Sequence, residues 1–149
     1  MKGIIVGASK VGKTKFVSDL IQREYSAYIP TYGIDTNNIG EHTILDTSGK
    51  KLYGSIVKSF YDKADLLIFM YNSVETFATI ESYVKPFRGR VIVLYNGTDE
   101  NVFELGLLYK KMYQTPCFQC INTEHTWEQI LQCMKPSKKP WRYCVLDCI

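Results

Sequence analysis

The stretch GASKVGKT, residues 7–14, decides the fold of this 149-residue chain. It has the form G-x-x-x-x-G-K-[ST], in which glycines let the backbone bend round phosphate groups while its N–H groups point inward. The apolar run GIIV at 3–6 precedes it and is typical of a buried strand, and KTKFVSDLIQREY at 13–25 follows with helical spacing. This context predicts a phosphate site in which Lys13 contacts the β- and γ-phosphates and Thr14 ligates Mg²⁺.

Apolar runs and amphipathic segments alternate along the rest of the chain. We expect short strands at about 34–38 and 41–46, joined near Gly40, and further strands at 65–71, 90–95 and 116–120. Helices are expected at 52–64, 74–87, 100–113 and 124–134. The predicted fold class is α/β, a mostly parallel sheet of about six strands with helices on both faces. In such sheets ligands bind beyond the carboxyl ends of the strands.

Length and composition favour one globular domain. Hydrophobic residues make up 46% of the chain and charged residues 22%, which is ordinary for a globular protein. The net charge of +3 is mild and no long run of Lys or Arg occurs, so no nucleic-acid partner is expected. Five cysteines, an odd number, without a secretory pattern favour reduced thiols and a cytoplasmic location. No apolar stretch reaches the ~18 residues of a spanning helix.

Two further motifs follow apolar strands. In ILDTSGKK, residues 44–51, Asp46 closes a strand and can hold Mg²⁺, and Gly49 can bring its backbone N–H close to a γ-phosphate. In LYNGTDE, residues 94–100, Asn96 and Asp99 can read a base edge. A carboxylate only accepts hydrogen bonds, which suits the N–H donors of guanine. The alternative for this second motif is a plain Asn-Gly turn.

With its motifs in this order, the chain resembles the Ras superfamily of small GTPases, nearest to the Ras and Rab branches. The resemblance runs over 1–134, which would form the P-loop NTPase domain, and leaves 135–149 as a C-terminal tail. YIPTYGID at 28–35 resembles the first switch, and the segment from Asp46 resembles the second. The resemblance implies binding of GTP or GDP with Mg²⁺. It also implies unidentified protein effectors or regulators that contact residues 28–36 and 46–61.

The resemblance also assigns individual site residues. Thr31 would join Thr14 and Asp46 as a Mg²⁺ ligand. Tyr28 would close over the nucleotide and Tyr25 would stack on the base, although both are equally consistent with surface tyrosines. The residues expected to contact the nucleotide are Ser9, Lys10, Val11, Gly12, Lys13, Thr14, Lys15, Tyr25, Tyr28, Thr31, Asn96, Asp99, Ile121 and Asn122.

The first departure from the family lies at the catalytic position after Gly49. Lys50 replaces the glutamine that orients the attacking water in the family. A lysine only donates hydrogen bonds, so we predict hydrolysis at or below the ~10⁻⁴ s⁻¹ of unassisted Ras-type proteins. The simpler alternative is that Lys50 is a solvated loop residue and another group positions the water.

Three more departures affect the base site and the hairpin. Gly97 replaces the lysine of Asn-Lys-x-Asp, a loss that should cost about 1–3 kcal/mol of nucleotide affinity. Ile121 and Asn122 stand in the Ser-Ala-Lys loop, where a backbone N–H to guanine can survive without the side-chain support. The hairpin between Thr31 and Asp46 is shorter than usual, so the effectors of Rab proteins cannot be carried over to this chain.

The sequence therefore predicts a Ras/Rab-like guanine-nucleotide switch with slow or impaired hydrolysis. The alternative is a pseudo-GTPase that acts as a protein-binding decoy or scaffold, because the departures spare the phosphate loop. A P-loop nucleotide kinase is less favoured, because no arginines cluster where a lid would need them.

The tail changes character from the domain before it. Neither Cys144 nor Cys148 stands at the fourth position from the end that a C-a-a-X box needs. Its basic residues, beside Trp141, are compatible with weak association with an anionic membrane surface, but a tail that packs back or is disordered is the favoured interpretation.

Overall fold

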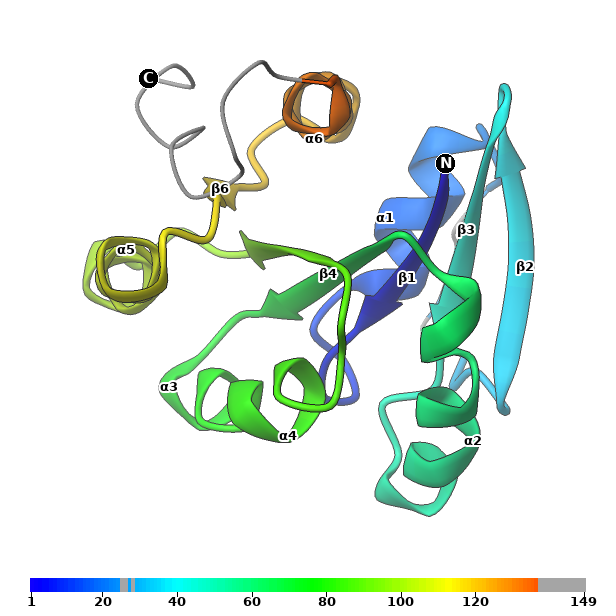
Figure 1. Cartoon of the computed structure of the whole chain (residues 1–149), viewed down its shortest axis with the longest axis horizontal. Coiled ribbons are helices and arrows are strands. Elements are labelled where there is room, and N and C mark those ends of the chain that lie inside the picture. The colour runs from blue at the N-terminus through cyan, green and yellow to red at the C-terminus, as the bar shows by residue number, and fades with distance from the viewer. Residues whose placement is uncertain (25–26, 28, 137–149) are drawn as a thin grey trace.

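The computed structural model of the chain describes residues 1–24, 27 and 29–136. Its centre is a six-stranded sheet with the strand order β2-β3-β1-β4-β5-β6 (Figure 1). Only β2 runs antiparallel to its neighbour, and every other pair is parallel. The strands are β1 (Lys2–Val6), β2 (Ile34–Ile39), β3 (His42–Thr47), β4 (Leu66–Tyr71), β5 (Arg90–Tyr95) and β6 (Cys117–Gln119). The predicted α/β class, with its mostly parallel sheet of six strands, is confirmed.

Helices cover both faces of this sheet (Figure 1). Phe16, Trp127 and Ile130 pack α1 and α6 against one face, and the other face is covered by α2 to α5. None of the helices in the described part of the chain is long and apolar enough to cross a bilayer. The helices are α1 (Lys13–Leu20), α2 (Gly54–Ser59), α3 (Val74–Phe77), α4 (Ile80–Val84), α5 (Glu100–Tyr113) and α6 (Thr123–Met134), with 3₁₀ turns η1 (Lys51–Tyr53) and η2 (Tyr61–Lys63).

The buried central strands explain the uninterrupted apolar runs of the sequence. Every residue of β4 is buried, as are Gly3 to Val6 of β1, because helices shield both faces of these strands. Strand pairing places Ile5 of β1 beside Asp46 of β3, and Val6 beside Phe69 of β4. The loop after β1 therefore starts next to the end of β3, at the carboxyl edge of the parallel strands.

Three of the predicted helices are shorter than their patterns indicated. The first ends at Leu20, because Gln22 adopts a left-handed backbone with a φ of 54° that a helix cannot continue. The segment at 74–87 forms α3 and α4 with a break between them. There the Thr79 hydroxyl donates to the carbonyl oxygen of Thr76 at 2.7 Å, a local bond that competes with helical pairing.

The segment predicted as one helix at 52–64 is η1, α2 and η2 in succession. Only Val57 and Tyr61 of these turns are buried, so little packing stabilises a continuous helix there. The strand predicted at 116–120 is limited to β6, while the remaining predicted elements agree with the structure to within about a residue.

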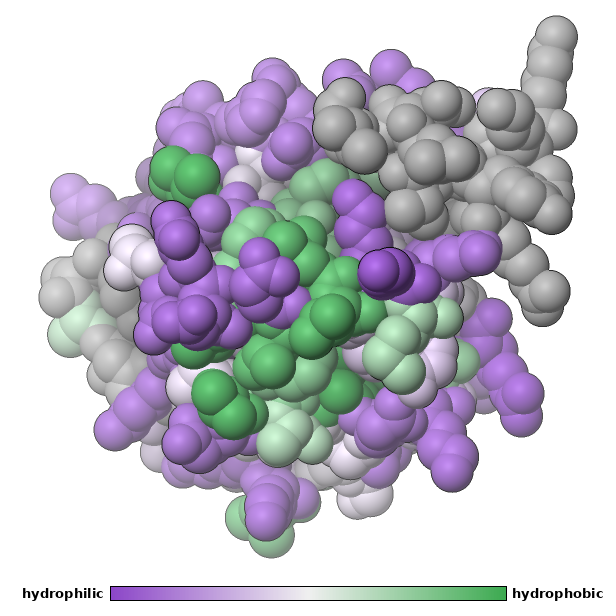
Figure 2. All heavy atoms as spheres, turned by 90° about the vertical axis from the view of Figure 1, so that its left-hand side faces the viewer, coloured by the Kyte–Doolittle hydropathy of each residue, from purple (hydrophilic) through white to green (hydrophobic). Residues whose placement is uncertain are grey.

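Apolar side chains also remain exposed on one face of the molecule. Figure 2 shows this face, which α3 and α5 form, with its apolar residues gathered near the centre. On these two helices the exposed large apolar residues are Val74, Leu108, Met112 and Tyr113.

Candidate nucleotide-binding site

The loop between β1 and α1 bends round a cavity of about 360 Å³. Gly7 and Gly12 have φ angles of 145° and 103°, which side chains rarely adopt. A Cβ at Gly7 would also meet the carbonyl oxygen of Met70, and one at Gly12 would meet the amide of Asn96. Both motif glycines are thus required by the backbone and by close packing of β4 and β5 beneath the loop.

Lys13 is a buried cation held by the loop itself. Its Nζ donates to the carbonyl oxygens of Gly7 at 2.9 Å and Ala8 at 2.8 Å, and the residue is 6% exposed. Burial lowers the pKa of Lys13 to about 8, and the charge of Asp46 offsets part of this shift. The ammonium group is therefore poised at the cavity floor with only neutral carbonyl partners.

Three oxygen-bearing side chains meet beside Lys13. Thr14 donates to Oδ2 of Asp46 at 2.6 Å, and the Thr31 hydroxyl lies 3.0 Å from that of Thr14 and 3.4 Å from the same Oδ2. Asp46 Oδ1 is buried and has no hydrogen-bond partner among the described residues. Burial raises the pKa of Asp46, while the Thr14 hydroxyl and the Lys13 charge oppose that rise.

This arrangement suits a small divalent cation. Mg²⁺ takes oxygen ligands and is commonly held through one carboxylate together with hydroxyls, waters and phosphate oxygens. An unpaired buried carboxylate oxygen is costly unless a cation or donor satisfies it, so Oδ1 of Asp46 is the clearest sign of such a ligand. In the described part of the chain no cluster of three or more His, Cys, Asp or Glu residues offers a different metal site.

The segment after β3, which the resemblance assigns to the second switch, closes another side of the cavity. A Cβ on Gly49 would collide with the backbone of Ala8 and Ser9, so only glycine allows this approach. Thr47 also lines the cavity, which its sequence position did not predict; its hydroxyl donates to the carbonyl oxygen of Ile5 at 2.7 Å. The lining residues are Ser9, Lys10, Gly12, Lys13, Thr14, Lys15, Thr31, Thr47 and Gly49.

Lys50 lies outside this lining. Its Nζ sits 4.9 Å from the ring centroid of Tyr32, a cation–π contact between the loop before β2 and the turn after β3. Tyr32 in turn makes an edge contact with Tyr53, at 6.5 Å between ring centroids. The described residues that line the cavity include no carboxylate, carboxamide or imidazole side chain.

A second cavity, of about 190 Å³, adjoins the first at Gly12 and Lys15. Asn96 lines it and donates from Nδ2 to the carbonyl oxygen of Val11 at 2.8 Å, which ties β5 to the phosphate loop. Ile121 also lines it and is 85% exposed. The remaining lining residues, which sequence reasoning missed, are Phe16, Asp19, Met70, Cys120 and Thr123.

Of the described residues that were predicted to contact the nucleotide, three line neither of these cavities. The side chain of Val11 is fully buried in the core under α1. Asp99 Oδ1 accepts hydrogen bonds from the N–H groups of residues 101 and 102 at 2.9 and 3.4 Å, so it caps α5. Asn122 caps α6 in the same way, through Oδ1 and the N–H of His125 at 2.9 Å. Both residues come directly before a helical pattern, which is the sequence signal of a cap.

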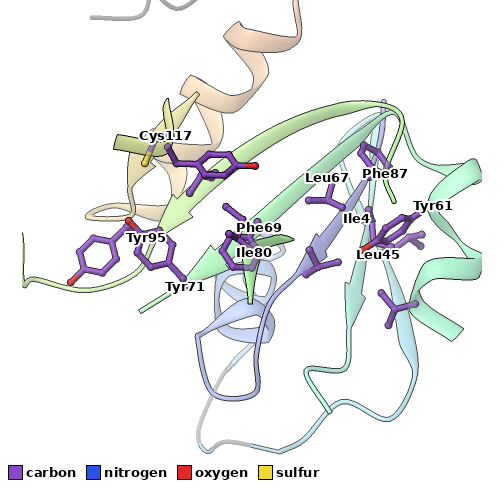
Figure 3. Close-up of a cluster of buried hydrophobic side chains, with 14 of the residues drawn as sticks. Ile4, Leu45, Tyr61, Leu67, Phe69, Tyr71, Ile80, Phe87, Tyr95 and Cys117 are labelled. Carbon is purple, nitrogen blue, oxygen red and sulfur yellow. The ribbon is translucent and has the colours of Figure 1, made fainter. Parts of the chain in front are cut away.

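A tyrosine occupies the space beside Gly97. A Cβ at Gly97 would lie 2.5 Å from Oη and 2.8 Å from Cζ of Tyr95, which is 1% exposed. Tyr95 Oη accepts a hydrogen bond from the N–H of Asp99 at 2.9 Å. The ring also packs on Tyr71, with 5.1 Å between the ring centroids. Figure 3 labels both side chains in the buried cluster. Tyr95 thus fixes the turn from 96 to 99 from below.

Some predicted positions lie outside the described residues. These are Tyr25 and Tyr28 and, in the tail, the cysteines at 144 and 148 and the basic residues beyond Lys135.

Comparison with known proteins gives matches to one group of proteins. The family model described as "Ras of Complex, Roc, domain of DAPkinase" matches residues 2–91. The chain is 30% identical over 98 residues to the Ypt/Rab-type GTPase ypt7 of Schizosaccharomyces pombe, covering 58% of this chain and 48% of that protein. It is 28% identical over 123 residues to Ras-related protein Rab7 of Glycine max, covering 75% and 58% of the two chains. These matches span about half the length of the relatives.

Proposed function

The chain belongs to the Roc family within the Ras superfamily of small GTPases. From this premise we propose that it binds a guanine nucleotide with Mg²⁺ and acts as a molecular switch that hydrolyses GTP slowly. The observation that carries this proposal is the unpaired, buried Oδ1 of Asp46 beside the hydroxyls of Thr14 and Thr31, under a complete phosphate loop. The cation and the phosphates would satisfy these groups together.

The phosphate chain would lie along the loop between Gly7 and Thr14, where backbone N–H groups and the start of α1 favour an anion. Lys13 would turn its Nζ from the loop carbonyls to the terminal phosphates, a stronger partner for an ammonium group. Bound Mg²⁺, held by Thr14, Thr31 and Asp46, would neutralise phosphate charge.

The switch action would depend on two segments that reach the same cavity from different elements. Thr31 comes from the loop before β2, and Gly49 from the turn after β3. Loss of the terminal phosphate would remove a shared partner from both segments. Protein partners would then sense residues 28–36 and 46–61, where Tyr32 and Leu52 expose 69% and 80% of their surface.

The surroundings of the cavity support the proposal of slow hydrolysis. The described lining offers no carboxylate, carboxamide or imidazole side chain to act as a general base toward water, and Lys50 contacts Tyr32 instead. Chemistry would therefore rest on phosphate positioning and charge neutralisation alone, until a partner supplies the missing group.

The pseudo-GTPase is the second candidate, and one observation favours it. Two residues at the family's base-recognition motif have structural contacts instead. Gly97 packs on Tyr95, and the carboxylate of Asp99 caps α5. In that case the fold would serve as a protein-binding scaffold, and its partners would bind whether or not nucleotide is present.

Titration with fluorescent GDP, GTP and ATP analogues, with and without Mg²⁺, tests the proposal. Binding should require Mg²⁺ and should be lost in Lys13→Ala, whereas Lys111→Ala, an exposed lysine of α5, should bind as the unaltered protein does. Absence of binding at micromolar protein in the presence of Mg²⁺ would refute nucleotide binding and leave the scaffold. Equal affinity for ATP would show that the pocket reads phosphate alone.

A further inference from the structure

The phosphate loop contains one side chain in a backbone conformation that favours glycine. Three residues of the segment 7–14 have a positive φ, namely Gly7 at 145°, Lys10 at 64° and Gly12 at 103°. A left-handed residue in such a loop helps to point successive N–H groups at an anion, and glycine adopts it at no steric cost. A lysine in the same conformation lowers stability. The shape of the loop therefore does not explain why position 10 carries a lysine.

A carboxamide side chain at the end of β4 holds this conformation in place. Nδ2 of Asn72 donates to the carbonyl oxygen of Lys10 at 3.2 Å, and Oδ1 of Asn72 accepts from the Thr76 hydroxyl, also at 3.2 Å. Backbone strain persists where the surrounding structure determines the conformation, and such residues gather at functional sites. The strained lysine is thus a built feature of the loop, and its side chain is the part that requires a functional explanation.

The position of Lys10 in the phosphate cavity suggests that explanation. Lys10 lines the cavity of about 360 Å³ together with Lys13 and Lys15. Lys13 is buried at the cavity floor, and the charge of Lys15 is balanced by Asp19, with 2.9 Å between Nζ and Oδ2. Lys10 is exposed, so it brings positive charge to the cavity from the solvent side.

We propose that the Lys10 side chain is a second phosphate-binding cation, which closes over the solvent side of the bound phosphates and slows release of the nucleotide. This inference rests on the proposed nucleotide binding. An ammonium group makes charge-assisted hydrogen bonds to phosphate oxygens, and the flexible stem of lysine lets it reach them while the loop stays in place. The phosphates are then held by Lys13 from the buried side and by Lys10 from the open side. The strain in the free loop is offset in the nucleotide complex.

Replacement of Lys10 by glycine tests both halves of this inference in one variant. Lys10→Gly relieves the left-handed strain, so Tm of the nucleotide-free protein should rise by about 2–4 °C. The same variant should release a fluorescent GDP analogue, in the presence of Mg²⁺, roughly 10- to 100-fold faster, which corresponds to the loss of a hydrogen bond between charged groups. A gain in stability together with faster release cannot arise from misfolding.

Three further variants separate the charge of Lys10 from its backbone conformation. Lys10→Gln keeps the strain but removes the charge, so release should be fast while Tm stays unchanged. Lys10→Arg keeps both and should release the GDP analogue slowly. Gln114→Gly is the matched control, because Gln114 also has a left-handed backbone, with a φ of 55°, but lies at the end of α5 outside both cavities. It should raise Tm and leave the release rate within about twofold.

The outcomes distinguish this inference from the function on which it rests. Release from Lys10→Gly at the rate of the unaltered protein would overturn the role of Lys10 and leave nucleotide binding intact. A lower Tm in Lys10→Gly would also overturn it, because the lysine would then serve the fold. Failure of the unaltered protein to bind any nucleotide would overturn both proposals. Fast release in Lys10→Gly and Lys10→Gln, with slow release in Lys10→Arg and Gln114→Gly, would establish the inference.

Discussion

Restoring the lysine that the family carries at Gly97 should harm this protein. In Gly97→Lys the new Cβ would lie 2.5 Å from Oη and 2.8 Å from Cζ of Tyr95. The ring cannot yield cheaply, because Tyr95 is 1% exposed, packs on Tyr71 and accepts a hydrogen bond from Asp99. The substitution therefore forces either the ring or the turn to move.

The size of the effect can be worked from these contacts. Overpacking of a buried site costs about 1–3 kcal/mol, and loss of the bond from the Asp99 N–H to Tyr95 Oη adds about 1 kcal/mol. For a chain of this length each kcal/mol lowers Tm by about 2–4 °C, so Tm should fall by roughly 5–15 °C. Nucleotide affinity should fall too, because the displaced turn carries Asn96, which braces the phosphate loop.

Thermal unfolding and GDP titration of three variants test this reasoning. Gly97→Ala adds the Cβ without the charge and should reproduce most of the loss of stability. As a single substitution, Tyr95→Leu should lower stability, but in combination with Gly97→Lys it should relieve the clash. The double variant Tyr95→Leu/Gly97→Lys should therefore lose less stability than the sum of the losses in the two single variants. A Gly97→Lys protein with unchanged Tm and tighter GDP binding would refute the argument.

Three further predictions concern the phosphate cavity. Nucleotide affinity should fall as pH rises above about 8, by up to about tenfold per pH unit. In the free protein Lys13 has a pKa of about 8 and loses its proton in this range, whereas bound phosphate keeps it protonated. Nucleotide titrations at pH 7, 8 and 9 check this prediction. Gly49→Ala should lower the affinity for GTP by roughly tenfold or more, since the added methyl group meets the backbone of the phosphate loop. An unchanged affinity in a GTP titration would mean that Gly49 does not approach this loop. Lys50→Gln should raise the single-turnover hydrolysis rate by about tenfold or more, and an unchanged rate would mean that another group positions the water.

The phosphate half of the site could be predicted from the sequence because its geometry is local. One continuous segment from Gly7 to Thr14 supplies the loop, the lysine and the helix start, and its strand-before, helix-after context is specific to phosphate loops. Asp46 and Gly49 could be placed beside it because parallel strands bring their carboxyl ends to one edge. The helix breaks at Gln22 and Thr79 could not be foreseen, since they depend on backbone conformation and local hydrogen bonds that hydrophobic spacing does not encode.

The second cavity could not be predicted from the sequence because its walls come from four separate stretches of the chain, at 12–19, 70, 96 and 120–123. Asp19 occupies a polar position on α1 that a helical pattern assigns to solvent, and only the approach of Thr123 reveals its place beside the phosphate loop. Asp99 shows the converse. It matches a base-reading motif, yet it directly precedes a helix, and its carboxylate caps that helix in the structure.

Hydrogen-bond accounting distinguishes a rebuilt base site from a decayed one. Mutational decay would leave buried polar groups without partners, because each lost side chain strands the group that it served. At the base side Tyr95 Oη, the carbonyl oxygen of Gly97 and Oδ1 of Asp99 are all paired within the protein. Within the described residues, the one buried side-chain atom without a partner is Oδ1 of Asp46, at the other end of the site. The base side thus forms hydrogen bonds within the protein, while the opposite end of the site keeps a buried carboxylate oxygen suited to a cation, which is the pattern expected if phosphate and metal binding are retained and base contacts are not.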